Sequence, residues 1–170
     1  FHSAYLACQI AVQHMTPVVV LSDAYIANGS GAWRLPIVTE LPEIRPHKVK
    51  ANSTTPYSPY QRDPESLARY WATPGMQGCE HVVGGLEKDN ETGSISNKPD
   101  NHALMTRLRA EKVARIPVSD IHVLGDKNDA DLLIVGFGGT FGHLYTAMEE
   151  LRKHGRKVAL AHFRVINPLP

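Results

Sequence analysis

The chain has 170 residues, of which 42% are hydrophobic and 21% charged, as is typical of a soluble globular protein that buries a core. Its formal net charge of +1 comes without a long run of one sign, so we expect no nucleic-acid or anionic-membrane partner. The longest apolar runs are strand-sized, whereas a membrane-spanning helix needs about 20 apolar residues, so no membrane segment is expected.

The two cysteines, Cys8 and Cys79, lie far apart in the sequence and in no metal-ligand spacing. An iron–sulfur or zinc site needs about four clustered ligands, so we expect no metal site built by this chain alone. So few cysteines favour a reducing compartment, and the cytoplasm is the expected location.

The N-terminal part predicts a helix followed by a strand. Apolar residues recur at helical spacing over Phe1–Met15, and Thr16-Pro17 ends the pattern because a residue before proline avoids helical geometry. The apolar run Val18–Leu21 then predicts a fully buried strand. Asp23 follows it, at the edge where parallel sheets build sites, so Asp23 is a candidate for contact with a ligand or partner. The alternative is that it caps the next turn.

The next part of the chain is expected to be mostly extended. Leu35–Tyr60 carries many prolines and little periodicity, as do segments that join domains or cross subunit interfaces. Asp63–Tyr70 then predicts a short helix, with Asp63 as its N-cap and Pro64 at its first position.

A strand, a charged turn and a long helix are expected after this. Glu80–Leu86 has the composition of a strand. The polar turn Glu87–Gly93 is typical of a solvated loop, and a functional role is the alternative. Asp100 or Asn101 is expected to cap a half-buried helix that runs to about Arg115, with its basic face in solvent.

The C-terminal part predicts one βαβ unit. Leu132–Phe137 is a buried strand, Thr140 caps a helix that ends at Gly155, and Val158–Phe163 is the next parallel strand, reached by a right-handed crossover. Two parallel strands with one helix do not bury both faces of a sheet. Because the chain also begins without a methionine, we expect it to be a piece of a longer polypeptide.

The turn between strand and helix, GFGGTFG, resembles a dinucleotide-binding fingerprint only in part. Gly136 and Gly138 match its first two glycines, but Phe141 stands at the third. No acidic residue follows Glu150 to hold a ribose, although Arg164 could accommodate a 2′-phosphate. The pattern favours glycines that let the backbone turn and pack, and leaves a nucleotide site as the alternative.

Six segments occur in the same order as in a known family: TPVVVLSDAYIANGS, WRLP, EHVVGGLEKDNETG, NHALMTRLRAEKVARI, DLLIVGFGGTFG and KVALAHFRVINPLP. On these segments the sequence resembles the alpha subunit of 2-oxoacid:ferredoxin oxidoreductases, most closely that of the 2-oxoglutarate enzyme. The resemblance covers nearly the whole chain.

The resemblance implies an α/β fold in three parts. Residues 1–35 would be the C-terminal end of a thiamine-diphosphate pyrimidine-type domain. Residues 36–125 would be a connecting segment with a helix near 101–115. Residues 126–170 would begin a transketolase C-terminal-like domain with a Rossmann-type parallel sheet.

The resemblance also implies a function. These enzymes decarboxylate a 2-oxoacid with thiamine diphosphate and Mg, pass electrons through iron–sulfur clusters to ferredoxin, and form an acyl-coenzyme A. Partners would be a beta subunit and the rest of the alpha chain, and this chain alone would hold no cofactor. No catalytic, cofactor or metal residue carries over. Four candidates would lie at an interface or tune substrate access: Asp23, His81, Glu87 and Asp89.

Two alternatives stand beside this reading. The chain could be a Rossmann-like module that binds a nucleotide or coenzyme A on Gly136–Gly142. It could also be a non-catalytic docking module that joins subunits through its proline-rich middle.

Overall fold

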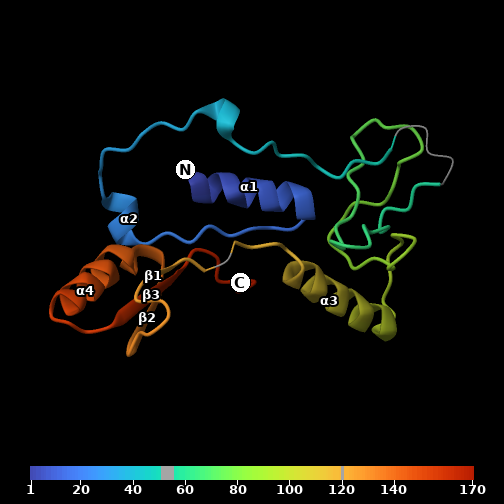
Figure 1. The fold of residues 1–170 in the computed structure, drawn as a ribbon. Helices are drawn as coiled ribbons and strands as arrows, with labels where there is room; N and C mark the ends of the chain where they lie inside the picture. Colours follow the sequence, from blue (N-terminus) through green and yellow to red (C-terminus); the bar gives the residue numbers. More distant parts are fainter. Residues whose placement is uncertain (51–55, 120) are drawn as a thin grey trace. The chain divides into compact units, whose positions relative to one another are not determined.

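The computed structural model describes residues 1–50, 56–119 and 121–170 (Figure 1). They form two compact units, one made of Phe1–Val19 with Thr39–Ile116 and the other of Val20–Val38 with Pro117–Pro170. No helix in the described ranges is long and apolar enough to cross a membrane. The elements in chain order are α1 (His2–His14), α2 (Ala24–Asn28), η1 (Val38–Glu40), α3 (Pro99–Ala114), β1 (Val123–Gly125), β2 (Leu132–Phe137), η2 (Gly138–Thr140), α4 (Phe141–Lys153) and β3 (Val158–Phe163).

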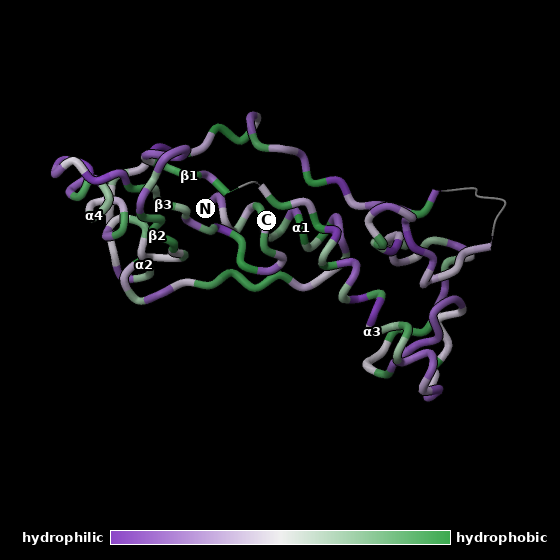
Figure 2. The backbone as a smooth tube through the Cα atoms, turned by 60° about the horizontal axis from the view of Figure 1, so that its bottom comes forward, coloured by the Kyte–Doolittle hydropathy of each residue, from purple (hydrophilic) through white to green (hydrophobic). Residues whose placement is uncertain are grey.

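The second unit contains the predicted βαβ unit, which confirms the α/β class. Strands β2 and β3 are parallel, with Leu132 opposite Val158 and Phe137 opposite Phe163. Hydrophobic colouring runs along both strands (Figure 2). Helix α4 lies against the sheet (Figure 1) and contributes Met148 to a core with Val158 and Leu160. As predicted, α4 begins after Thr140, and Gly155 follows its end with a φ of +76°. The prediction that Thr140 caps the helix with its side chain is wrong, because its hydroxyl donates to the Phe137 carbonyl at 2.7 Å instead.

The third strand of this sheet could not be predicted from the sequence. β1 pairs antiparallel with β3, so the strand order is β1-β3-β2 and the sheet is mixed rather than purely parallel. Its three residues lie within the range expected to be a connecting segment. A strand of three residues is too short to show the alternation by which strands are detected in a sequence.

Burial of β2 differs from expectation. Leu133, Val135 and Phe137 share one face of the strand and are 56%, 57% and 58% exposed. Ile134, on the opposite face, packs against the core. The prediction of a buried strand is therefore wrong for one face of β2 in the described residues, because one helix covers only one face of a sheet.

The first unit is built from α1, α3 and the irregular chain between them. Helix α1 confirms the predicted helix and ends at Met15, whose φ is 46°. Its Val12 carbonyl accepts a hydrogen bond from the Trp71 indole at 2.8 Å. The backbone of Trp71 also forms an isolated parallel β-bridge with Lys48. The described part of the predicted extended segment is irregular except for η1, as expected, while residues 51–55 of that segment lie outside the described residues.

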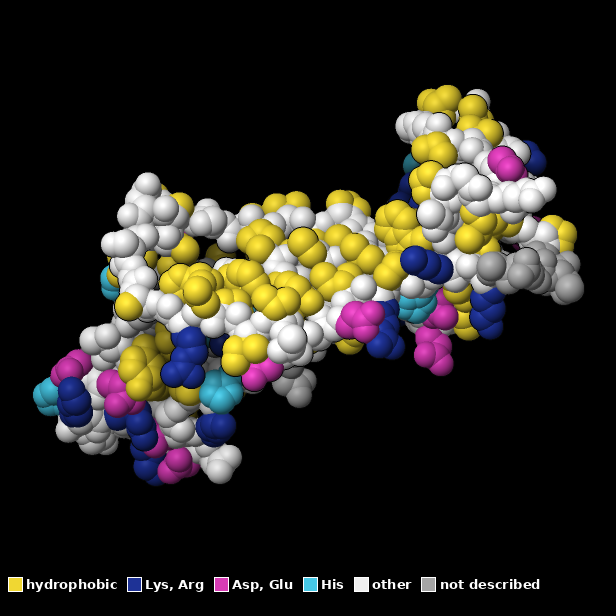
Figure 3. Space-filling view, turned by 90° about the horizontal axis from the view of Figure 1, so that it is seen from above, with side chains coloured by type: hydrophobic (Ala, Val, Ile, Leu, Met, Phe, Trp, Pro, Cys, Tyr) yellow, Lys and Arg dark blue, Asp and Glu magenta, His cyan; other side chains and the backbone are white. Residues whose placement is uncertain are grey.

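Two predicted strands are wrong. Val18–Leu21 has no strand partner among the described residues, and Val19 is 80% exposed. Glu80–Leu86 is also irregular, with Val83 84% exposed. Strand composition alone does not make a strand, since a ladder needs a neighbour to pair its backbone groups. Figure 3 shows hydrophobic side chains gathered at the surface, and the exposed apolar residues of the N-terminal part include Leu6 and Val20.

The short helix predicted at Asp63–Tyr70 does not form. Asp63 does cap a turn, because its carboxylate accepts hydrogen bonds from the backbone N–H groups of Glu65 and Ser66. Leu67 then adopts a φ of 57°, and the chain reverses its direction. As a result, the backbones of Arg62 and Arg69 form an isolated antiparallel β-bridge. The sequence shows the cap correctly but not the reversal, which is incompatible with a continuing helix.

Candidate functional site

The glycine turn after β2 is explained by packing. A Cβ added at Gly136 would stand 2.2 Å from Leu144 Cδ1, so the absence of a side chain lets α4 approach β2 closely. Gly138 has a φ of +63°, a conformation that L-residues rarely adopt. A Cβ added at Gly139 would stand 2.1 Å from Asp23 Oδ2. Gly136, Gly138 and Gly139 are thus each explained by a different structural requirement.

Asp23 caps a helix and also holds the glycine turn. Its Oδ1 accepts a hydrogen bond from the Ile26 backbone N–H at 2.9 Å, at the start of α2. Its Oδ2 accepts one from the Gly139 N–H at 3.1 Å. A carboxylate therefore stands at a backbone N–H that a phosphate would need on this turn, and its negative charge opposes a nucleotide there. The capping alternative for Asp23 agrees with the structure, and contact with a ligand or partner stays a prediction.

The charged turn Glu87–Gly93 is an ordered hairpin-like turn. The Asp89 N–H donates to the Ser94 carbonyl at 2.7 Å, and the Ser96 N–H donates to the Glu87 carbonyl at 3.0 Å. Asp89 Oδ1 accepts hydrogen bonds from the backbone N–H groups of Glu91 and Thr92, and these bonds lower the pKa of the Asp89 carboxyl, with the Thr92 bond as the largest cause. The turn is polar, but its backbone is fixed by its own hydrogen bonds.

Asn101, one of the two residues expected to cap the long helix, instead joins that helix to the charged turn. Helix α3 begins at Pro99, and the buried Asn101 amide donates to the Lys88 carbonyl at 2.9 Å while its oxygen accepts from the Asn90 N–H at 3.0 Å. Lys88 is only 3% exposed, and its ammonium donates to the Gly84 carbonyl at 3.1 Å. The turn is therefore attached to α3 through buried polar contacts.

A second attachment runs through Glu87. Its carboxylate accepts from His102 Nδ1 at 2.5 Å and pairs with the Arg109 guanidinium at 3.3 Å. The His102 hydrogen bond is the largest cause that lowers the pKa of the Glu87 carboxyl, with Arg109 adding to it. Glu87 and Asp89, both predicted as candidates, thus belong to one turn on the first unit.

The other two candidates, His81 and Asp23, do not take part in the hydrogen bonds described for this turn. The His81 ring contacts the Tyr57 ring at 5.4 Å between centroids, and its Nδ1 lies 2.8 Å from the Cys79 carbonyl. Asp23 belongs to the second unit. No hydrogen bond or ion pair joins any two of the four candidates in the described parts of the chain.

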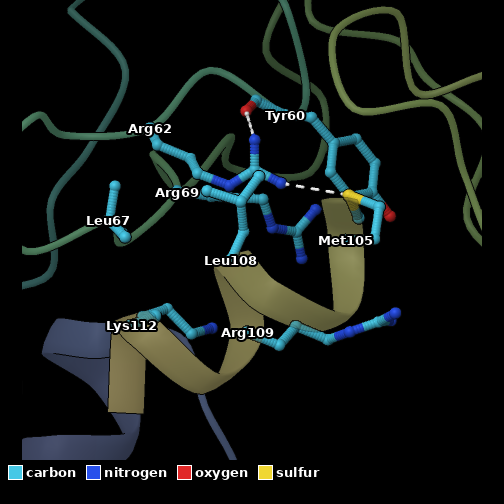
Figure 4. Close-up of a pocket in the computed structure, with 8 residues that line it drawn as sticks. All are labelled: Tyr60, Arg62, Leu67, Arg69, Met105, Leu108, Arg109 and Lys112. Atoms are coloured by element: carbon cyan, nitrogen blue, oxygen red, sulfur yellow. Dashed lines mark hydrogen bonds between the residues drawn. The ribbon is translucent and has the colours of Figure 1, made fainter. Parts of the chain in front are cut away.

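The first unit also contains a pocket lined by basic side chains, which was not expected from the sequence. Arg109 and Lys112 of α3 line it together with Arg62 and Arg69, so the basic face of this helix is not simply solvated (Figure 4). A signal was present in the sequence, because Met105, Arg109 and Lys112 recur at helical spacing and so share one face of α3. The two arginines from the preceding loop could not be placed there without knowing the reversal at Leu67.

The described residues do not fit a metal centre or a cluster. They contain no group of three or more His, Cys, Asp or Glu side chains that could hold a metal ion. Cys8 is exposed and Cys79 is half-buried, and both are free thiols. Among the described residues there is thus no such group of side chains for the magnesium and iron–sulfur clusters that the family resemblance implies.

No protein-family model matches the chain. Comparison with known proteins finds relatives that align over all of it. It is 47% identical over 170 residues to the 2-oxoglutarate oxidoreductase subunit KorA of Mycobacterium tuberculosis. It is 30% identical over 176 aligned residues to the alpha subunit of 2-oxoacid:ferredoxin oxidoreductase 1 of Aeropyrum pernix. The chain spans about a quarter of the length of these relatives, 26% and 27% respectively.

A solved structure agrees with the sequence relatives. The 2-oxoglutarate:ferredoxin oxidoreductase of Magnetococcus marinus, determined with 2-oxoglutarate, coenzyme A and succinyl-CoA bound, superposes with a TM-score of 0.81 at 27% identity. The match covers 95% of this chain and 28% of that one. The resemblance seen in the sequence is confirmed: over its whole length, the chain is related to the alpha subunits of 2-oxoacid:ferredoxin oxidoreductases and corresponds to about a quarter of them.

Proposed function

We propose that this chain is part of the alpha subunit of a 2-oxoacid:ferredoxin oxidoreductase, with 2-oxoglutarate as the 2-oxoacid. The enzyme would carry out the coenzyme A-dependent oxidative decarboxylation or the reverse reductive carboxylation. The observation that carries the proposal is the 47% identity to a 2-oxoglutarate oxidoreductase subunit, which extends over all 170 residues. The three-dimensional match to a 2-oxoglutarate enzyme supports it independently of that relative.

Within such an enzyme, the chain would position other parts rather than perform chemistry. Its glycine turn is filled by the Asp23 carboxylate, and its described residues offer no metal-binding cluster. Thiamine diphosphate, magnesium and the iron–sulfur clusters would thus be bound elsewhere in a cytoplasmic holoenzyme that includes a beta subunit and uses ferredoxin and coenzyme A. The family assignment of residues 1–35, 36–125 and 126–170 to three domain parts belongs to the same proposal.

We propose that the charged turn Glu87–Gly93 is the part of this chain that affects the activity or assembly of the complete enzyme. Loops held by a rigid scaffold are where specificity is commonly placed. The turn is held rigidly by the buried Asn101 amide and by the Glu87 ion pairs. We place His81, Glu87 and Asp89 near the interface of alpha and beta subunits, where each would tune substrate access or assembly. Asp23 is kept as a weaker candidate for a contact of the same kind.

The two alternative functions are less well supported. A nucleotide or coenzyme A on Gly136–Gly142 would have to displace the Asp23 carboxylate from the Gly139 N–H. A pure docking module agrees with the exposed apolar side chains, such as Val83 and Phe137, but does not explain similarity along the entire chain to one enzyme subunit.

The test is an activity assay of the complete polypeptide that carries this chain, purified together with its beta subunit. We expect reduction of ferredoxin or a redox dye that requires both 2-oxoglutarate and coenzyme A. Glu87→Gln should lower kcat/KM by about tenfold or less, which is small beside the loss of an acid–base catalyst. Its control is Glu40→Gln, in the short helix η1. An active complex that uses no 2-oxoacid would contradict the proposal.

A further inference from the structure

The basic pocket on the first unit is a defined cavity with room for a small ligand. Its volume is about 170 Å³, whereas a single water needs only about 10–15 Å³. Figure 4 shows Arg109 and Lys112 extending from α3, with Arg62 and Arg69 on the opposite wall beside the Tyr60 ring. Four cationic side chains from two separate segments therefore line one cavity.

Arg62 and Arg69 are held in place by neutral groups. Arg62 donates to the side-chain oxygen of Asn90 at 2.7 Å and to the sulfur of Met105 at 3.3 Å. Arg69 stacks on the Tyr60 ring, with its guanidinium carbon 4.5 Å from the ring centroid. Such contacts fix the direction of a guanidinium without cancelling its charge.

Negative charge is scarce around the pocket. Lys112 donates to the Met15 carbonyl at 2.8 Å, and Arg109 pairs with Glu87 at 3.3 Å. For Arg62, Arg69 and Lys112, the described residues provide no carboxylate partner, which leaves at least three positive charges uncompensated. Like charges held together repel one another, so the cluster is stabilised by any anion that enters it.

We propose that this pocket binds a phosphate group, either as free inorganic phosphate or as the phosphomonoester end of a small ligand. Guanidinium forks donate two parallel hydrogen bonds to phosphate oxygens, and an ammonium adds a point charge. A phosphate dianion compensates more of the excess charge than a single carboxylate does. The proposal goes beyond the proposed oxidoreductase function and does not depend on it.

The protonation of Lys112 gives the site a pH signature. Burial, followed by the charges of Arg69, Arg62 and Arg109, lowers the pKa of Lys112 to about 8. His14 also faces Lys112, and burial is the largest cause that lowers its pKa, so His14 adds little positive charge near neutral pH. A bound anion favours the charged ammonium. Affinity is therefore highest below about pH 8 and falls as Lys112 loses its proton above that value.

The test is calorimetric titration of inorganic phosphate into the complete polypeptide at about pH 7, where Lys112 is protonated. We expect saturable binding that Arg69→Gln and Lys112→Gln each weaken by about tenfold or more. The matched control is Arg107→Gln, which removes the same charge from an exposed position on α3 that does not line the pocket. Because Lys112 also contacts the Met15 carbonyl, Arg69→Gln keeps the test valid if the lysine variant fails to fold.

Two further arms complete the test. Glycerol phosphate separates the two sources of phosphate: binding at least as tight as that of inorganic phosphate indicates an esterified ligand, and weaker binding indicates the free ion. Sulfate, which keeps its charge over this pH range, should bind more weakly above about pH 8. The proposal is overturned if no saturable binding occurs, if Arg107→Gln weakens binding as much as Arg69→Gln, or if a carboxylate from a partner protein occupies the pocket in the assembled complex.

Discussion

Asp23 Oδ2 accepts a hydrogen bond from the backbone N–H of Gly139 at 3.1 Å, although 116 positions separate the two residues. The same carboxylate caps α2 through the Ile26 N–H. One side chain thus connects the start of α2 to the glycine turn that leads into α4, within the second unit. The turn resembles a nucleotide-binding turn in sequence, but in the structure it receives a carboxylate from its own chain.

This connection predicts energetic coupling between Asp23 and Gly139. Gly139→Ala should cost about 1 kcal/mol, because the new Cβ displaces the flexible carboxylate and breaks its hydrogen bond. In an Asp23→Ala background the same change should cost almost nothing, since the nearest atoms that the Cβ would meet all belong to Asp23. Hydrogen exchange of the β2 and β3 amides measures the local stability. Equal costs in both backgrounds would contradict the coupling.

Gly136→Ala is predicted to damage folding and not ligand affinity. Its Cβ would stand 2.2 Å from Leu144, which packs against the core, so we expect a loss of about 1–3 kcal/mol. Gly142→Ala is the matched control, because a Cβ there has open space within α4 and alanine is the better helix former, by about 0.5–1 kcal/mol. The readout is again exchange protection of the β-sheet amides. A Gly136→Ala protein of normal stability that had lost nucleotide binding would restore the nucleotide reading.

The elements that a single segment specifies could be predicted from the sequence. The strands Leu132–Phe137 and Val158–Phe163, the helix between them and the helix α1 all follow from local periodicity and end signals, and the structure contains each of them. The missing third glycine and ribose-binding acid also predict a packing role for the glycine turn, and the close approach of Leu144 to Gly136 agrees with it.

Features that depend on distant residues could not be predicted. Val18–Leu21 has strand composition, but no strand in the described residues pairs with it. The Asp23–Gly139 bond joins residues far apart, and the basic pocket needs the reversal at Leu67 to bring Arg69 toward α3. Asparagine is a common helix cap, but Asn101 is instead buried against the charged turn. This burial depends on tertiary contacts, which no local sequence pattern shows.

Asn101→Ala is predicted to loosen the charged turn. The change leaves the Asn90 N–H and the Lys88 carbonyl without their buried partner, and each such loss costs about 1–3 kcal/mol. Hydrogen exchange at Asn90 should accelerate strongly, while Asn97→Ala, an exposed asparagine of the same segment, should leave it unchanged. Equal exchange rates in the two variants would show that the turn is held without Asn101.

The Glu87 contacts predict that the stability of the charged turn decreases in acid. The pKa of the Glu87 carboxyl is lowered in the folded chain, chiefly by His102, so its stabilising contribution is present above the unfolded value of about 4.3 and is lost as the pH falls through the folded pKa. Wild type and Glu87→Gln should therefore differ in turn protection near neutral pH and converge in acid. A difference that persists in strong acid would mean that the carboxylate charge is not its cause.

We propose that the chain is a working segment of a 2-oxoglutarate:ferredoxin oxidoreductase alpha subunit. To test this, the matching quarter of the Mycobacterium tuberculosis KorA subunit is replaced with this chain, and the chimera is assembled with the beta subunit. The measurement is the rate of 2-oxoglutarate-dependent reduction of a redox dye. We predict an assembled chimera whose rate lies within about tenfold of the parent's, because the chain would shape access and assembly without performing chemistry. A chimera that folds and assembles but shows no activity with 2-oxoglutarate would contradict the proposed function.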